Sequence, residues 1–233
     1  MKRLLLAKTG APSIAWRRGH FEHWFGPLFA PFDVRLQVWD AQLDAPPAGT
    51  WDAMVVTGSP CSVHDRAPWS ERAAGFLLDH IDDTAILGVC YGHQLLAHAL
   101  GARTGPNPSG AEYGVTPVQV TPDPLFTGMG PVIDTYQMHS NAVLELPQGA
   151  RRIARSARTS IQGFAIGDRV RTVQFHPEFD RDYVRTALTA RSEALDATEP
   201  GFSGRALASV RELPHAGAVV QNFLEHIAGF ERR

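Results

Sequence analysis

Cysteine is scarce in this chain, which has only Cys61 and Cys90 among its 233 residues. Two cysteines are too few for the disulfide framework of a small secreted protein, so we expect a reducing, cytoplasmic setting. Long apolar runs are also lacking, since no stretch approaches the ~20 apolar residues that span a membrane. The short apolar run after Met1 meets a charge at Lys8, unlike a signal peptide. We therefore expect a cytoplasmic protein without a membrane partner.

The chain also lacks an excess of charge of one sign. It carries 22 Lys and Arg against 24 Asp and Glu, with a net charge of −2 and no basic block, which argues against nucleic acid as a partner. Repeats, low-complexity tracts and linker-like stretches are missing from the sequence, so we expect residues 1–233 to form a single domain. No GxxxxGK[ST] phosphate loop is present, and neither a cofactor nor a metal is expected.

Short apolar strands alternate with helices in the first hundred residues. "TAILGVC" (84–90) is apolar throughout, as in a strand covered on both faces, and "PWSERAAGFLLDHI" (68–81) begins with a proline typical of a helix start. This alternation predicts a parallel sheet between two layers of helices. The expected strands are 3–7, 34–40, 51–58 and 84–90, and the expected helices are 19–29, 68–81 and one from 93 that ends at Gly101.

After Ala102 the pattern changes to short strands separated by turns. Gly167 and Asp168 are typical of a hairpin turn. Residues 185–213 predict a helix and a loop, broken at Pro200 and Gly201. The remaining expected elements are strands at 115–120, 131–138, 151–157, 162–167 and 169–175, and a helix at 215–230. The predicted fold is therefore α/β and flavodoxin-like, with a mostly parallel sheet, helices on both faces and a smaller antiparallel strand region.

Cys90 stands between two glycines, Gly88 and Gly92, where a strand meets a helix. A glycine–nucleophile–glycine pattern is typical of a tight, strained elbow that lifts its side chain to the carboxyl edge of a sheet. The helix N-terminus favours a thiolate, and the backbone N–H of Tyr91 would face a developing oxyanion. A buried structural cysteine is the competing interpretation for Cys90, and it is the one we favour for Cys61.

A second motif, "RTVQFHPEF" (171–179), offers a base for that nucleophile. Pro177 biases His176 toward an extended backbone, in which residues two apart face the same side. Glu178 can then accept a hydrogen bond from one ring nitrogen of His176 and orient the other toward the cysteine. Alone, the motif could be a polar turn after an edge strand. With the elbow, it predicts a catalytic triad of Cys90, His176 and Glu178.

These motifs resemble those of the class I glutamine amidotransferases of the triad type. The resemblance rests on "GVCYGHQ" (88–94), on "QFHPEF" (174–179) and on "VVTGSP" (55–60), and it extends over nearly the whole chain. The segments "NPSGAEYG" (107–114) and "MHSNAVLELPQGA" (138–150) are most similar to free-standing members of that family.

The resemblance implies hydrolysis of the glutamine side-chain amide through a thioester on Cys90. It implies an oxyanion hole formed by the backbone N–H groups of Ser59 and Tyr91, although many relatives have Gly-Gly-Pro where this chain has Gly58-Ser59-Pro60. The positions that it assigns to the substrate are Gly58, Gln94, Met138, His139 and Ser140. The implied partner is glutamine or a γ-glutamyl small molecule, with a separate synthetase or ammonia-accepting subunit as a further possibility.

Other interpretations remain beside this one. A free-standing γ-glutamyl hydrolase would use the same acyl chemistry with a different leaving group, and a non-catalytic binding module could use the same fold. An α/β-hydrolase with a cysteine nucleophile is disfavoured because its acid normally precedes its histidine. A DJ-1-like protein shares the elbow but has no equivalent of the His-Pro-Glu motif. The sequence does not name the ammonia acceptor or the role of residues 185–213.

Overall fold

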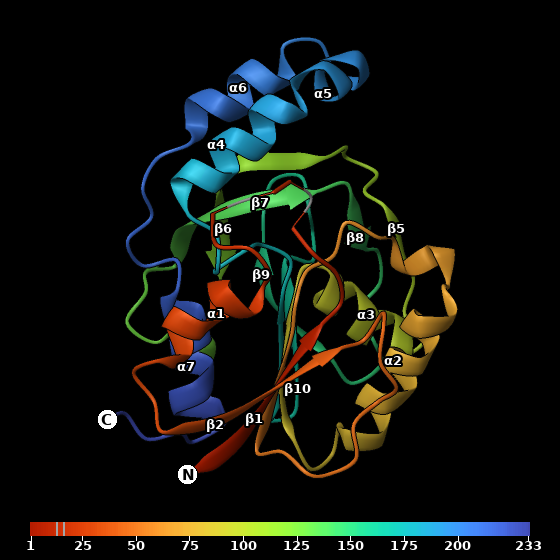
Figure 1. Cartoon of the computed structure of the whole chain (residues 1–233). Helices are drawn as coiled ribbons and strands as arrows, with labels where there is room; N and C mark the ends of the chain where they lie inside the picture. The colour runs from red at the N-terminus through yellow and green to blue at the C-terminus, as the bar shows by residue number, and fades with distance from the viewer. Residues whose placement is uncertain (13, 16) are drawn as a thin grey trace.

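A computed structural model of the protein describes residues 1–12, 14–15 and 17–233. Its helices and strands follow the predicted alternation in the first hundred residues (Figure 1). The helices are α1 (Glu22–Phe29), α2 (Pro68–His80), α3 (Tyr91–Ala99), α4 (Arg181–Ala190), α5 (Ser192–Thr198), α6 (Phe202–Ser209) and α7 (Ala218–Asn222). The strands are β1 (Lys2–Lys8), β2 (Val34–Asp40), β3 (Ala53–Val56), β4 (Ala85–Val89), β5 (Thr104–Pro106), β6 (Glu112–Val120), β7 (Val132–His139), β8 (Asn141–Val143), β9 (Arg151–Arg155), β10 (Gly163–Ile166) and β11 (Val170–Val173).

The main sheet has a parallel part and an antiparallel part. Its strand order is β2-β1-β3-β4-β11-β10-β9-β6-β7. The pairings from β2 to β11 are parallel, and those from β11 to β7 are antiparallel. β5 and β8 form a separate antiparallel pair. The α/β fold predicted from the sequence, with a parallel sheet and a smaller antiparallel region, is therefore confirmed.

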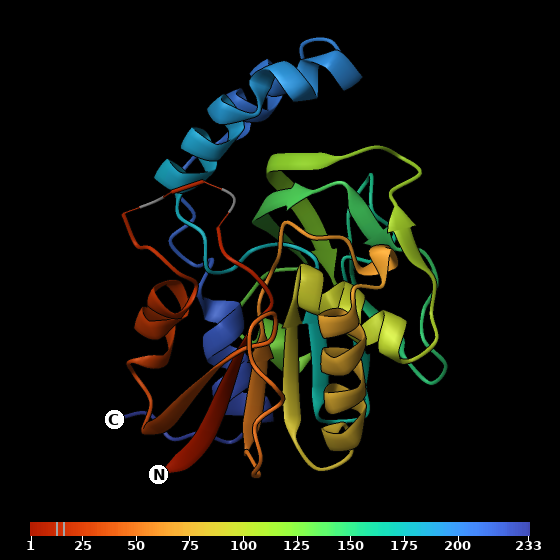
Figure 2. The ribbon, with the colours of Figure 1, turned by 45° about the vertical axis from the view of Figure 1, so that its right-hand side comes forward.

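Helices cover both faces of the parallel strands because alternate side chains of each strand point to opposite sides. In β1, Leu4 and Leu6 pack into a core cluster with α1 and α7, whereas Leu5 and Ala7 pack into a second cluster with α2 and α3. Figure 2 shows α1 and α7 on one side of these strands and α2 on the other. Strands buried on both faces explain why β4 is apolar throughout.

α4, α5 and α6 (residues 181–209), here called the helical cap, lie together at one end of the molecule beside β6 (Figure 1). The backbones approach closely at Gly114, whose φ is 91° and where an added Cβ would lie 2.5 Å from the hydroxyl oxygen of Ser209. That hydroxyl accepts a hydrogen bond from the Val115 N–H at 2.9 Å. The rings of Tyr113 and Phe202 meet edge to face, with centroids 6.3 Å apart. The cap is thus attached to β6 by close packing.

The observed elements differ from the predicted ones mainly after Ala102. Residues 185–213 contain the end of α4 and two further helices, instead of one helix and a loop, although the predicted break at Pro200 and Gly201 lies between α5 and α6. β5 and β8 were not predicted, and β6 begins at Glu112, three residues before the strand predicted at 115–120. The final helix is shorter than predicted, because α7 continues as a π-helical turn over Phe223–Ile227. Gly167 does lie in a hairpin between β10 and β11.

The part of the chain that the structure describes contains no helix long and apolar enough to cross a membrane.

Candidate active site

Cys90 lies directly after β4 and begins α3, in a conformation that residues with a side chain rarely adopt. Its φ is 52° and its ψ is −99°. Such a backbone is strained, and strain of this kind is concentrated at functional sites. The flanking glycines make the turn possible: a Cβ on Gly88 would lie 2.6 Å from the carbonyl oxygen of Gly92, and a Cβ on Gly92 would lie 2.5 Å from that of Val56. The predicted elbow is therefore present, and its glycines are required by close packing.

His176 reaches the elbow from the neighbouring strand, since β11 pairs with β4 in parallel. Its Nδ1 lies 2.8 Å from Oε1 of Glu178. A Cβ on Gly58 would lie 2.9 Å from Cε1 of His176 and 3.5 Å from Cβ of Cys90, so Gly58 is packed against both side chains. The Phe179 ring stacks on the imidazole, with an interplanar angle of 4° and centroids 3.9 Å apart. These contacts hold the imidazole in one plane beside the thiol.

The electrostatics of this group favour an imidazolium. Burial by itself would lower the pKa of His176, but the charges on Glu178 and Cys90 outweigh it and raise that pKa to about 10. The carboxylate of Glu178 is buried, and its Oε2 has no hydrogen-bond partner among the described residues. The site can therefore store a proton on His176 next to the sulfur of Cys90.

Two glutamines connect the thiol to the rest of the site. The Nε2 of Gln174 donates to Sγ of Cys90 at 3.5 Å. Gln174 in turn accepts a hydrogen bond from Nε2 of Gln94 at 3.0 Å, and the same nitrogen donates to the backbone carbonyl of Asn141 at 3.1 Å. Because both donors of Gln94 are engaged, its carbonyl oxygen is the group left for a ligand.

Two backbone N–H groups are available where an oxyanion hole was predicted. Among the described residues, neither Ser59 nor Tyr91 donates a hydrogen bond from its backbone nitrogen. The carbonyl of Gly58 accepts from the hydroxyl of Thr9 at 3.0 Å, which fixes the orientation of the Gly58–Ser59 peptide and hence of the Ser59 N–H. Ser59 is accommodated without a positive φ, so a serine fits in place of a glycine. The phenol oxygen of Tyr91 lies 2.6 Å from the hydroxyl oxygen of Ser70, and Tyr91 also lines the pocket that contains Cys90.

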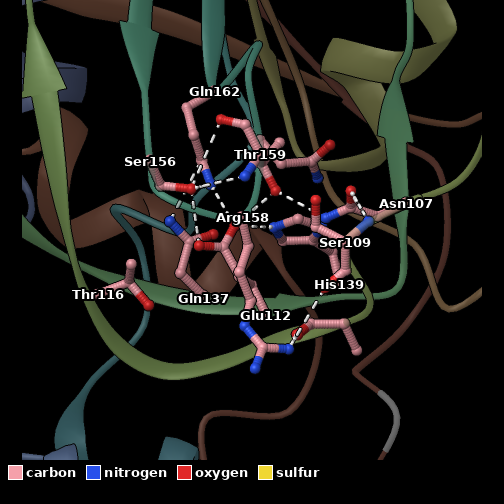
Figure 3. Close-up of polar contacts among 12 residues, drawn as sticks. Asn107, Ser109, Glu112, Thr116, Gln137, His139, Ser156, Arg158, Thr159 and Gln162 are labelled. Atoms are coloured by element: carbon pink, nitrogen blue, oxygen red, sulfur yellow. Dashed lines mark hydrogen bonds and ion pairs between the residues drawn. The ribbon is translucent and has the colours of Figure 1, made fainter.

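Met138, His139 and Ser140 lie at the end of β7, and a buried polar cluster supports them (Figure 3). Nδ1 of His139 lies 2.9 Å from the backbone carbonyl of Asn141, and its Nε2 lies 3.3 Å from Oε2 of Glu112. Burial would raise the pKa of Glu112, but the nearby imidazole of His139 and hydrogen bonds from hydroxyl groups outweigh it and lower that pKa. Glu112 also accepts hydrogen bonds from Ser156, Thr159 and Gln162. The cluster holds the 138–140 segment at a fixed position.

A pocket of about 260 Å³ joins these groups. It is lined by Ala11, Phe21, Ser59, Pro60, Cys61, Cys90, Tyr91, Gln94, Tyr113, Met138, His139, Ser140, His176, Phe179, Tyr183 and Arg191. A larger cavity of about 440 Å³ shares only His176 with it and does not include the thiol, so the smaller pocket is the candidate site. No group of three or more His, Cys, Asp and Glu side chains within the described ranges could hold a metal ion.

The family model of the class-I glutamine amidotransferases matches residues 29–192, which include the elbow, the His-Pro-Glu motif and the strands between them. The chain belongs to the class-I glutamine amidotransferase family. Its fold agrees with a glutamine amidotransferase from Thermotoga maritima, with a TM-score of 0.78 at 19% identity over 98% of this chain and 99% of that one.

Two curated relatives of the chain carry different activities in their names. A GMP synthase [glutamine-hydrolyzing] from Thermomicrobium roseum is 34% identical over 149 residues, which cover 64% of this chain and 26% of the relative. Gamma-glutamyl peptidase 3 from Arabidopsis thaliana is 30% identical over 141 residues, which cover 57% of this chain and 56% of the relative. The matched region thus spans about a quarter of the first relative and just over half of the second.

The structure brings most of the residues predicted from the sequence to one pocket. Glu178 lies behind His176, and Gly58 packs beneath His176 and Cys90; neither lines the pocket. Sequence reasoning missed Gln174, although it stands two residues before His176 and therefore on the same side of an extended chain. It did not assign Tyr183 or Arg191 to the site, because no local pattern indicates which residues of α4 and the segment after it reach the pocket.

Proposed function

We propose that the chain hydrolyses the side-chain amide of glutamine and releases glutamate and ammonia, the ammonia passing to an unidentified acceptor or to a partner synthetase. Sγ of Cys90 attacks the amide carbonyl, and the C–N bond breaks to leave a γ-glutamyl thioester. His176 gives its proton to the departing ammonia and then takes one from a water molecule. That water attacks the thioester, glutamate leaves, and Cys90 is regenerated.

The observation that carries this proposal is the juxtaposition of Cys90 with the buried His176–Glu178 pair. The thiol stands on a strained elbow, and the pair is held by a 2.8 Å contact. Ser59 and Tyr91 offer backbone N–H groups for the oxyanion that have no partner in the described part of the chain. The candidate binding groups for the amino-acid end line the same pocket: Gln94, Met138, His139 and Ser140. Gly58 contributes by leaving space for the imidazole.

A second candidate function is hydrolysis of γ-glutamyl peptides or conjugates. The wall that α4 contributes to the pocket, through Tyr183 and Arg191, favours it because a larger leaving group needs contacts beyond those for ammonia. The peptidase relative supports this alternative, and the GMP synthase relative supports the first. We favour glutamine. A non-catalytic module is the third candidate, and the presence of cysteine, histidine and glutamate argues against it.

We also propose that residues 1–233 act as one amidotransferase-like domain in the cytoplasm, without a metal, a cofactor, nucleic acid or a membrane as partner. Glutamine-hydrolysing relatives of greater length motivate the search for a separate synthetase partner.

The proposal is tested by incubating the pure protein with glutamine and with a γ-glutamyl dipeptide and measuring released glutamate. Glutamate from glutamine that depends on Cys90 is the expected result. A kcat/KM more than tenfold higher for the dipeptide would reverse the order of the two candidates, and no release from either substrate would contradict both.

A further inference from the structure

Arg191 is the cationic residue of the helical cap that reaches the candidate active site. It follows the last residue of α4 and lines the same pocket as Cys90 and Met138. Among the described lining residues there is no carboxylate, and no other lysine or arginine. The pocket therefore presents one permanent positive charge that no neighbouring acid neutralises.

The guanidinium of Arg191 has no partner among the residues that the structure describes. Its Nη1 is buried and has no hydrogen-bond partner, and among the described residues no ion pair or side-chain hydrogen bond involves it. Other arginines near the cap behave differently: Arg158 and Arg205 both pair with Glu199, and Arg181 pairs with Asp182. Leaving a buried charged donor unsatisfied costs free energy, which a bound anion would recover.

We infer that Arg191 binds a carboxylate of the γ-glutamyl substrate. A planar guanidinium matches a carboxylate with two parallel hydrogen bonds, and a partly buried one does so with little competition from water. Two carboxylates are chemically equivalent here: the α-carboxylate of the glutamyl group and, in a γ-glutamyl peptide, the carboxylate of the leaving amino acid. The inference rests on the proposed function, and it assigns a recognition role to the cap.

Kinetics on three substrates separate the two sources. Glutamine and γ-glutamylglycinamide carry only the α-carboxylate, whereas γ-glutamylglycine also carries one on its leaving group. In Arg191→Gln, we expect KM to rise about ten- to a hundredfold, with a smaller change in kcat. This rise corresponds to the usual loss of affinity when a charge-assisted hydrogen bond is removed. A rise for γ-glutamylglycine alone assigns Arg191 to the leaving group, and an equal rise for all three assigns it to the α-carboxylate.

Two further variants distinguish recognition from a structural effect. Arg191→Lys keeps the charge, so its KM should lie between those of Arg191→Gln and the wild type. Arg185→Gln removes an exposed arginine from the same helix and should leave all three KM values unchanged. If Arg191→Gln stays within twofold of the wild-type KM on every substrate, the inference is wrong, while the proposed hydrolysis still stands.

A binding measurement keeps the inference testable if the wild-type protein turns over none of the substrates. Calorimetry compares the affinity of Cys90→Ala and of Cys90→Ala/Arg191→Gln for γ-glutamylglycine and for glutamine. A loss of at least tenfold in affinity for one ligand supports the inference without any catalysis. Equal affinities, or no binding to Cys90→Ala, overturn it.

Discussion

The sheet edge that carries Cys90 and the helical cap that carries Arg191 are built in opposite ways. Every residue of β4 is buried, and an added methyl group at Gly88 or Gly92 would collide with backbone. α5, in contrast, has no buried residue, and exposed pairs such as Arg158 with Glu199 help to attach the cap to the rest of the chain. Dense packing therefore fixes the position of Cys90 at the sheet edge, whereas the cap is held in part by charged pairs that are exposed to water.

The first prediction tests whether the edge carries the chemistry. Cys90→Ala and His176→Ala should each lower kcat for glutamate release about 10⁴-fold or more, because nucleophile and base act as one unit. For the same reason, the double variant should be little worse than either single variant. Glutamate release is measured on variants whose thermal unfolding matches the wild type. Full activity in Cys90→Ala would contradict the mechanism.

The second prediction concerns Glu178, which orients and charges the imidazole. Glu178→Gln should lower kcat by between about a hundredfold and ten-thousandfold and leave measurable activity. It should also lower the pKa of His176, since it removes the negative charge that raises this pKa most.

The pH dependence of stability checks the same prediction with a definite sign. A histidine whose pKa is raised from 6.5 to about 10 contributes stability that is fully present below pH 6.5 and is lost as the pH rises to about 10. Urea unfolding between these pH values should therefore show a larger loss of stability in the wild type than in Glu178→Gln. If stability fell equally with pH in the two proteins, Glu178 would not be what raises the pKa of His176.

The third prediction compares Gly92, where a Cβ would collide with a neighbour, with Gly75, where there is open space for one. Gly92→Ala should destabilise the protein by about 1–3 kcal/mol, because its Cβ would overlap the carbonyl of Val56. Gly75→Ala is the matched control in α2: nothing lies within 4 Å of its Cβ, and it should stabilise the helix by about 0.5–1 kcal/mol. Chemical denaturation measures both. An equal effect of the two substitutions would contradict the packing of the elbow.

The fourth and smallest effect is expected in the cap. Arg158→Ala removes an ion pair with Glu199 in which both side chains are exposed, at 38% and 41%, so screening by water should keep the loss of stability small. The reactivity of Cys90 should be unchanged. A large drop in that reactivity would show that the cap and the edge are not independent.

The difference between the two regions also explains how far the sequence predicts the molecule. β4, α3 and the elbow could be predicted because local rules dictate them: an apolar strand, a helix start and two glycines around Cys90. The placement of His176 and Glu178 on the same side could be predicted because residues two apart in an extended chain face the same way. The ends of the strands differed by a few residues, since pairing with neighbours decides where a strand stops.

The cap and the second layer of the site could not be predicted in this way. The position of Arg191 depends on how the cap packs against β6, and Ser209 at the end of α6 meets Gly114 of β6 across about 95 residues of chain. Glu112 and His139 likewise meet only because β6 and β7 pair in one register. Contacts between distant segments leave no local pattern in a sequence, which is why the polar cluster of Figure 3 was missed.

Covalent labelling of the thiol tests directly whether Cys90 is a nucleophile that His176 activates. An electrophilic analogue of glutamine is incubated with the wild type, with His176→Ala and with Cys90→Ala, and the modified peptide is identified by mass spectrometry. We expect one adduct, on Cys90, in the wild type. Excess glutamine should slow its formation, and labelling in His176→Ala should be much slower. Labelling of exposed Cys61 at the same rate as Cys90, or labelling of Cys90 that neither glutamine nor His176→Ala affects, would contradict it.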